Sequence, residues 1–496
     1  MTNRSLAQRI FSFPTMLGGA LLLTLFLLAS SPNRSGRALS DPDIWWHLAN
    51  AKYLVTTHHF IRQDFYSFTL SGTRWLNIEW LAELPYYFAF HAFSYTGLYL
   101  MTMVLASAIV LGTYWLAWLR TGDVKASFAT GWIAVFFASV SLAPRMLLFG
   151  WLLLVVQLLI EQLFRKGRDY TWAMPVVFAL WINLHGSWMI GFVLWLVWVG
   201  SGFVRGRWGA VVAIPWTPQQ RKKLLIVTAV SLAALLLNPY GWRLVAYPFD
   251  MAFAQAENLK QIAEWATIDF HGLRGKFVMG VLFLMVVLNL VRRRRWPLSE
   301  LLMALIVVYS GLTYSRFLFM AGIVLAPMLA VDLGWGVRWL LGGYDPKTDG
   351  VGRNVAALAV LGAVIVYTIP PVAAMHVGAM DSFPEQALPR LAQIPASARI
   401  FNHYEWGGFM IWNQPQHHTF VDSRTDIFVH AGTLTDYASA VTPFHSLEVL
   451  DKYHIDYVFI PHETAMAYLL EQSAGWTVDY KDDLTVIFRR TTVAKP

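Results

Sequence analysis

Repeated apolar runs, each near the length that crosses a lipid bilayer, constrain this chain more than any other feature of its sequence. A transmembrane helix needs about 20 mostly apolar residues, with a range of about 17–25. Only 14% of the 496 residues are charged, whereas soluble globular chains carry about 25%. The runs predict a polytopic α-helical membrane protein and exclude a soluble enzyme, a disulfide scaffold and a disordered chain. The eleven predicted spans are Phe13–Ser30, Gly97–Leu119, Ala126–Ala143, Met146–Phe164, Thr171–Leu184, Trp188–Val204, Leu224–Leu237, Phe277–Val291, Leu298–Tyr314, Phe317–Gly336 and Val355–Val372.

The basic residues indicate which side of the membrane each loop faces. The 38 Lys and Arg residues outnumber the 30 Asp and Glu residues, and they gather in alternate loops. Cytoplasmic loops carry such an excess, so the charge of +8 is explained by topology and predicts no nucleic-acid partner. With an odd number of spans, we expect the N-terminus inside the cell and the C-terminus outside. The first run could instead be a cleaved signal peptide, but its length favours an uncleaved anchor. The basic clusters are Arg4 and Arg9, Arg120 and Lys125, Arg165–Arg168, Arg205–Lys223, Arg292–Arg295 and Arg338–Arg353.

Three long segments then lie on the outer side. They are the first outer loop (residues 31–95), the second outer loop (238–276) and the C-terminal tail (373–496). In the tail, 418–421 and 456–460 are typical of strands, and 446–453 and 463–472 of short helices. We therefore predict a small extracytoplasmic α/β domain after a membrane module of residues 1–372. The chain has no cysteine, which excludes disulfides and thiolate metal sites.

Two carboxylates two residues apart open the first outer loop, at Asp41 and Asp43. Such a pair can bind a divalent cation such as Mg²⁺ or Mn²⁺, or one carboxylate can accept a proton from an attacking hydroxyl. Trp45, Trp46 and His47 follow directly, and the indoles offer flat apolar faces to sugar rings or lipid. The alternative is structural: Asp41 caps a helix that starts near residue 44, and the two tryptophans belong to an interfacial belt.

Further candidate residues for a site stand at the outer ends of other spans. Glu79 begins an aromatic segment that we expect to form a helix in the plane of the membrane interface. Arg145 and Arg316 lie where the positive-inside rule gives no reason for cations, so they suit an anion such as phosphate. An ordinary ion pair with an outer-loop acid is the alternative. His185, at a turn, and Glu264, in the second outer loop, are candidate substrate contacts or plain loop residues.

Two segments of the C-terminal tail are dense in polar and aromatic residues. They are residues 402–408, which include Gly407 and Gly408, and residues 421–426. The glycine pair indicates a tight turn or a close approach of two backbones. Loops beside strands can bind ligands, although turns gather there as well.

This order of features resembles the GT-C superfamily of integral-membrane glycosyltransferases. The superfamily includes protein O-mannosyltransferases, lipid A aminoarabinose transferases and the catalytic subunits of oligosaccharyltransferases. Asp41 and Asp43 stand where these families keep their catalytic acidic motif, and residues 77–87 stand roughly where some carry a Pro-rich segment, although only Pro85 is present here. A similarity over nearly the whole chain is to uncharacterised bacterial members with an Asp-x-Asp-Ile-Trp-Trp-His first-loop motif. The Trp-Trp-Asp motif of oligosaccharyltransferases is missing, which argues against en bloc transfer of an oligosaccharide to asparagine.

The resemblance implies a GT-C-like bundle of about 11 helices in a bacterial cytoplasmic (inner) membrane. It also implies transfer of a sugar from a polyprenyl-phosphate donor to a lipid, glycan or protein acceptor on the outer face. Asp41 or Asp43 would then act as general base or, less favoured, as a metal ligand. Arg145 and Arg316 would hold the lipid phosphate.

Two other classes of function remain open from the sequence. A transporter or flippase of lipid-linked sugars would need ionisable residues along its pathway, and most of the predicted spans are nearly free of acids. A non-catalytic envelope assembly protein would tolerate loss of both first-loop carboxylates. The cytoplasmic loops carry no phosphate-binding Walker pattern, which argues against an ATP-driven pump.

Overall fold

Each predicted span coincides with a helix in the computed structural model, which describes residues 5–30, 41–139, 142–254, 266–375, 382–442 and 444–491. By length and composition, five described helices can cross a membrane, and five shorter apolar helices accompany them. The prediction of a polytopic α-helical membrane protein is confirmed. The helices that match the predicted spans are α2 (Phe13–Ala29), α5 (Trp80–Thr121), α6 (Val124–Ala138), α7 (Leu147–Arg165), α8 (Met174–Leu184), α9 (Trp188–Ser201), α10 (Pro218–Ala234), α13 (Leu273–Arg292), α14 (Leu298–Thr313), α15 (Leu318–Leu341) and α16 (Val351–Thr368).

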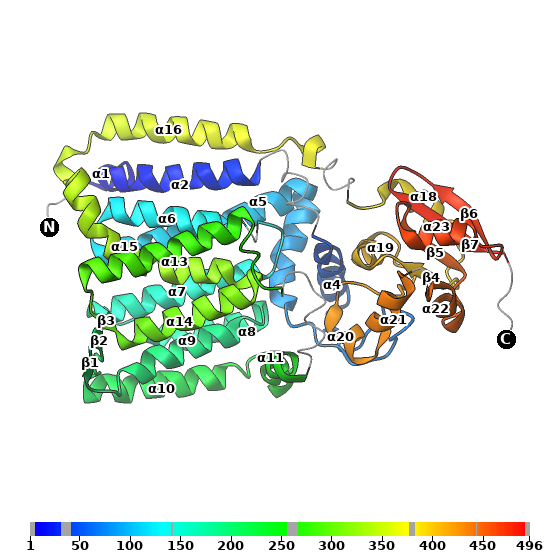
Figure 1. Cartoon of the computed structure of the whole chain (residues 1–496), viewed down its shortest axis with the longest axis horizontal. Helices are drawn as coiled ribbons and strands as arrows, with labels where there is room; N and C mark the ends of the chain where they lie inside the picture. The colour runs from blue at the N-terminus through cyan, green and yellow to red at the C-terminus, as the bar shows by residue number, and fades with distance from the viewer. Residues whose placement is uncertain are drawn as a thin grey trace.

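These helices lie side by side in one bundle, with the C-terminal region beyond one end of it (Figure 1). Helix α15 is buried along most of its length and packs against α5, α6 and α14. Helix α16 packs against α2 at the edge of the bundle. The short helix α1 (Leu6–Ile10) precedes α2.

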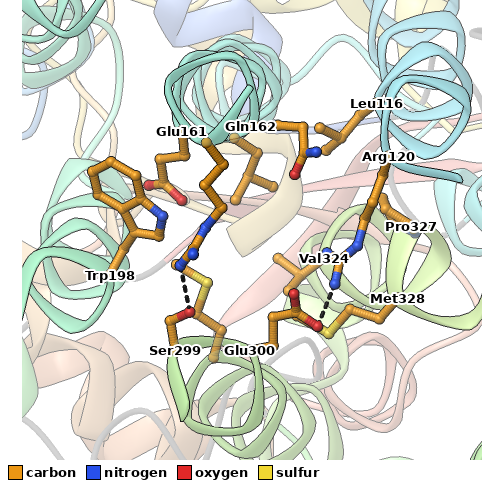
Figure 2. Close-up of a pocket in the computed structure, with 13 residues that line it drawn as sticks. Leu116, Arg120, Glu161, Gln162, Trp198, Ser299, Glu300, Val324, Pro327 and Met328 are labelled. Atoms are coloured by element: carbon orange, nitrogen blue, oxygen red, sulfur yellow. Dashed lines mark hydrogen bonds and ion pairs between the residues drawn. The ribbon is translucent and has the colours of Figure 1, made fainter. Parts of the chain in front are cut away.

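The opposite end of the bundle carries basic residues, several of which form ion pairs. A small sheet closes it, made of β1 (Arg207–Trp208), β2 (Val211–Val212) and β3 (Trp296–Pro297). Arg120 forms an ion pair with Glu300, as Figure 2 shows, and Arg165 donates to the Ser299 hydroxyl at 2.9 Å. The cavity between them has a volume of only about 50 Å³. This end is therefore tied together by side-chain contacts and offers space for little more than water.

The first outer loop contributes α4 (Asp43–Thr57) and the first part of α5 to the end of the bundle where the C-terminal region lies (Figure 1). Helix α5 has a kink at Ser94, whose φ of 52° is not helical, so it consists of two segments. A Cβ on Gly97 would lie 1.9 Å from the Ala89 carbonyl oxygen, so only glycine permits this sharp bend. The first segment matches the predicted interfacial helix, and α11 (Trp242–Ala254) lies in the second outer loop.

The C-terminal region is a small α/β unit, as predicted. Its sheet has the order β4-β5-β7-β6, in which β4 and β5 are parallel and the other pairs antiparallel. The predicted strand at 456–460 and the two predicted helices are confirmed as β5, α22 and α23. The strands are β4 (Ile400–Asn402), β5 (Tyr457–Pro461), β6 (Trp476–Lys481) and β7 (Thr485–Arg490), and the helices are α18 (Leu388–Leu391), α19 (Gly407–Asn413), α20 (Thr425–His430), α21 (Thr433–Ala440), α22 (Ser446–Lys452) and α23 (Ala465–Glu471).

The prediction of a strand at 418–421 was wrong. Only Thr419 makes a β-bridge, and its partner is Ser67 of the first outer loop. The Thr419 N–H donates to the Tyr66 carbonyl at 2.9 Å, and the Phe68 N–H donates to the Thr419 carbonyl at 3.0 Å. The backbone of this segment therefore pairs with a loop about 350 residues away in sequence, a contact that local periodicity does not report.

Candidate functional site

A cavity of about 860 Å³ lies where the first outer loop, the ends of the bundle helices and the C-terminal region meet. It brings together most of the predicted site residues. Two are not among them: Trp45 does not line the cavity, and Glu264 lies in 255–265, outside the described residues. The predicted residues that line it are Asp41, Asp43, Trp46, His47, Glu79, Arg145, His185 and Arg316.

Asp41 organises the start of α4. Its Oδ1 accepts the backbone N–H of Asp43 at 3.0 Å, and its Oδ2 forms an ion pair with Arg145. A helix does start near residue 44, but its N-cap residue is Pro42 and not Asp41, so the alternative expectation for Asp41 was wrong in that detail. The alternative expectation for Arg145, an ion pair with an outer-loop acid, is correct. Both groups nevertheless line the cavity. The ion pair between Asp41 and Arg145 therefore forms part of the cavity wall that a ligand would contact.

Asp43 and His47 are four residues apart on α4, so their side chains project from the same face of the helix. Burial and the neighbouring Asp41 carboxylate raise the pKa of Asp43 to about 6. The charge of His47, a hydrogen bond with Ser423 and the charge of Arg145 each lower this pKa. A carboxylate with a pKa near the working pH is better suited to accept a proton than an ordinary aspartate.

The two tryptophans of the motif have different environments. The Trp46 indole N–H faces Asp43 Oδ1 at 3.3 Å and the Ser423 hydroxyl at 3.1 Å, so it joins α4 to the C-terminal region. Trp45 is buried in an aromatic cluster, with its ring 5.4 Å from that of Phe383 and 5.3 Å from that of Phe409. Consecutive residues of a helix point in directions about 100° apart, and here Trp46 faces the cavity while Trp45 packs into the aromatic cluster.

The glycine pair of the tail permits this arrangement. A Cβ on Gly408 would lie 2.7 Å from the Pro42 carbonyl oxygen and 3.2 Å from Trp46. A Cβ on Gly407 would lie 2.4 Å from the Val421 carbonyl oxygen. Neither glycine has a positive φ in α19, so the pair serves the close approach of backbones that the sequence indicated.

Glu79 lies between two imidazoles at the wall of the cavity. The His185 Nε2 is 3.2 Å from Glu79 Oε1, and the His47 Nε2 is 3.4 Å from Glu79 Oε2. Burial raises the pKa of Glu79 to about 7, while His47 and Arg316 act against this rise. Burial and the nearby Arg316 and His47 lower the pKa of His185 to about 3, so this imidazole is neutral.

Sequence reasoning missed the residue at the centre of this network. Glu83 is 1% exposed and accepts hydrogen bonds from Asn50 at 3.0 Å and Asn77 at 2.7 Å. Its Oε1 also lies 2.9 Å from His47 Nδ1. Its spacing of four residues from Glu79 is the one signal in the sequence, because residues at that spacing share a helix face.

The C-terminal region supplies the opposite wall of the cavity, mostly from the two segments noted for their polar residues. Arg424 is fully buried between Asp422, at 2.6 Å, and Asp64 of the first outer loop, at 2.7 Å. The Tyr247 hydroxyl of α11 donates to Asp426 at 3.0 Å, and burial raises the pKa of Asp426 to about 6. The other residues of this wall are His403, Tyr404, Glu405, Ser423, Thr425, Leu434, Tyr437, Ala438 and Val441.

The acidic pair does not form a metal site by itself. Both oxygens of Asp41 already have partners within the protein. Within the described residues there is no group of three or more His, Cys, Asp or Glu side chains placed to hold a metal ion. A metal role of Asp41 and Asp43 therefore finds no support among the described residues.

The sequence matches no protein-family model and no curated protein. Solved structures do match in fold. The oligosaccharyltransferase of Archaeoglobus fulgidus, tethered to an acceptor peptide with an NVT sequon, aligns with 98% of this chain and 75% of its own, with a TM-score of 0.54 and 13% identity. The same organism's AglB, in complex with an inhibitory peptide and dolichol-phosphate, aligns with 99% and 75%, with a TM-score of 0.54 and 12% identity.

ArnT from Cupriavidus metallidurans, bound to undecaprenyl phosphate, aligns with 97% of this chain and 98% of its own. The TM-score is 0.53 and the identity 14%. These neighbours are GT-C glycosyltransferases, so the chain has the GT-C fold. At such identities the likeness concerns the fold, and the chemistry has to be argued from the cavity.

Proposed function

We propose that this chain is a membrane glycosyltransferase that moves a sugar from a polyprenyl-phosphate donor to an acceptor on the extracytoplasmic face. One observation carries the proposal: a single cavity at one end of a GT-C bundle combines buried carboxylates with two arginines. Transfer from a lipid phosphate needs cations beside the departing phosphate and a base beside the acceptor. The neighbouring structures with dolichol-phosphate and undecaprenyl phosphate support a donor of this class.

Asp43 is the proposed base. It takes the proton of the acceptor hydroxyl while the acceptor oxygen bonds to the anomeric carbon of the sugar and the bond from that carbon to the phosphate oxygen breaks. The electron pair of the broken bond stays on the lipid phosphate, next to Arg145 and Arg316. Asp41 is the weaker candidate for the base, because its carboxylate is already held by Arg145.

The arrangement of charges supports the proposed orientation. The basic loops gather at one end of the bundle, and the cavity lies at the other. If the basic end faces the cytoplasm, as the positive-inside rule predicts, the cavity faces outward. We retain the bacterial inner membrane as the proposed location, and residues 1–372 and 373–496 as the membrane and extracytoplasmic parts.

The proposal is tested with purified protein in nanodiscs and a panel of undecaprenyl-phosphate-linked sugars. Release of undecaprenyl phosphate and transfer of the sugar to added lipid, glycan and peptide acceptors are both measured. Each donor is run with and without EDTA, and the D41N/D43N double variant is measured beside the wild type. Turnover that vanishes in the double variant supports the proposal, and turnover that persists with EDTA supports a base over a metal ligand. No turnover in a broad panel, with transbilayer movement of the same lipids, would favour a flippase, and neither activity would favour an assembly protein.

Arg316 gives a prediction about binding. We expect Arg316→Gln to weaken the binding of undecaprenyl phosphate about tenfold or more, because a charge-assisted hydrogen bond to phosphate contributes about 1.5–3 kcal/mol. Binding is measured by native mass spectrometry or by displacement of a fluorescent lipid phosphate. Arg243→Gln is the matched control, because Arg243 is an exposed outer-face arginine that does not line the cavity. Equal affinities of the two variants would remove Arg316 from the phosphate subsite.

The pH dependence of turnover gives a second prediction. A base must be ionised, and the pKa of Asp43 is raised to about 6. The rate is therefore expected to be low at pH 5, to rise with a midpoint near 6 and to level off above pH 7. The profile of kcat/KM is recorded between pH 4.5 and 9. A rate that falls as the pH rises through 6 would contradict the assignment of Asp43 as the base.

A further inference from the structure

Four side chains form a continuous chain of alternating carboxylates and imidazoles beside the cavity. It runs from Glu83 to His47 at 2.9 Å, from His47 to Glu79 at 3.4 Å and from Glu79 to His185 at 3.2 Å. Glu83 lies on α5 and is buried, whereas the other three residues line the cavity. The chain therefore connects a buried carboxylate to the site.

The contacts of each ring define its protonation. Both nitrogens of His47 face carboxylates, Nδ1 that of Glu83 and Nε2 that of Glu79. When both carboxyl groups are ionised they only accept hydrogen bonds, so both nitrogens then carry protons and the ring is an imidazolium. His185 differs, because its Nδ1 accepts the backbone N–H of Ser187 at 2.9 Å. Its single proton then lies on Nε2, which is 3.2 Å from Glu79 Oε1, and the ring is neutral.

Glu83 is fixed in place by its hydrogen bonds. Three donors converge on it: the His47 ring, the Asn50 amide of α4 and the Asn77 amide of the first outer loop. Burial alone would make His47 neutral, but the hydrogen bond to Glu83 and the charges of Glu79, Glu83 and Asp43 overcome burial and raise its pKa. The carboxylate of Glu83 is thus the closest partner that keeps the ring charged.

We infer that Glu83 is a positioning residue that holds His47 as a cation beside Asp43, and that this cation keeps the Asp43 carboxylate ionised as a base. The inference rests on the proposed function, because it concerns the base of that reaction. Asp43 is buried near the Asp41 carboxylate, and both influences favour its protonated form. The charges that oppose them are His47, one helical turn away on the same face of α4, and Arg145, which is paired with Asp41.

The test is the pH–rate profile of Glu83→Gln, measured on the full chain in nanodiscs with the undecaprenyl-phosphate sugar that the wild type turns over fastest. An opposite charge a few ångströms away shifts a carboxyl pKa by about 1–3 units. Weakening the His47 cation is therefore expected to move the acid limb of kcat/KM by about one pH unit to higher pH. The rate then falls about tenfold on the acid limb and approaches that of the wild type at pH 8.5. The KM for the donor stays unchanged, since Glu83 does not line the cavity.

Two further variants complete the test. His47→Gln removes the cation directly, so it should shift the limb in the same direction, and the double variant should shift it no further than His47→Gln alone. Glu385→Gln is the control, because that carboxylate accepts the Tyr95 hydroxyl at 2.7 Å outside the cavity lining. Its profile should match that of the wild type.

The outcomes separate the inference from the function on which it rests. A uniform loss of rate at all pH values in Glu83→Gln, with a lower Tm, would mean a purely structural role and would overturn the inference. An unshifted pH–rate profile of Glu83→Gln, together with an inactive Asp43→Asn, would also overturn the inference but leave the proposed function standing. Full activity of Asp43→Asn would instead remove the proposed base itself.

Discussion

Replacing Asp43 with asparagine is expected to lower the rate of sugar transfer at least about 100-fold, which is the contribution of a positioned general base. Asparagine has the shape of aspartate and its Oδ1 still accepts the Trp46 indole N–H, so the link to Ser423 is retained. Only the capacity to take a proton is lost. Single-turnover rates with the preferred undecaprenyl-phosphate sugar measure the effect.

Unchanged donor binding and an unchanged Tm in the Asp43→Asn variant are the controls for folding. The acid limb near pH 6 should disappear together with the activity. Full transfer by a folded Asp43→Asn protein would show that Asp43 is not the base. If Asp43→Asn retained transfer activity and Asp41→Asn lost it, Asp41 would be the base. The geometry disfavours this result because the Asp41 carboxylate is paired with Arg145.

Replacing Arg424 with methionine is expected to cause the largest loss of stability. Arg424, Asp422 and Asp64 have fully buried side chains, and the guanidinium lies between the two carboxylates. Methionine fills a similar volume but leaves two negative charges buried without a cation. Breaking a buried ion pair in this way costs about 3–5 kcal/mol. A lower Tm in nanodiscs, followed by tryptophan fluorescence, measures the effect.

The matched control for Arg424→Met is Lys452→Met in the same C-terminal region. Lys452 pairs with Asp436 at 2.7 Å, but its side chain is 60% exposed. Exposed pairs contribute about 0–1 kcal/mol, so this variant should unfold close to the wild type. A similar Tm for both variants would show that the buried triad does not hold the first outer loop against the C-terminal region.

The membrane spans and the chemical character of the site were predictable because they depend on local properties. Apolar runs mark helices that cross the bilayer, and each predicted span coincides with a described helix. An acidic pair and two arginines at the ends of predicted spans indicated a site with both negative and positive charges, and Asp41, Asp43, Arg145 and Arg316 line one cavity. The strand prediction at 418–421 failed because the partner of that backbone lies in the first outer loop rather than in the sheet.

The sequence by itself determined the positions of the helices along the chain and the end of the bundle at which the candidate residues gather, since hydropathy and charge act residue by residue. Only the tertiary structure decided which of those residues meet. Asp41 pairs with Arg145 across 104 positions, and Trp46 contacts Ser423 across 377. Trp46 and not Trp45 faces the cavity, and Glu83 reaches His47, because packing between α4, α5 and α19 sets the rotation of each helix. The protonation of the site depends on these contacts, since a buried charge is set by the partners that surround it.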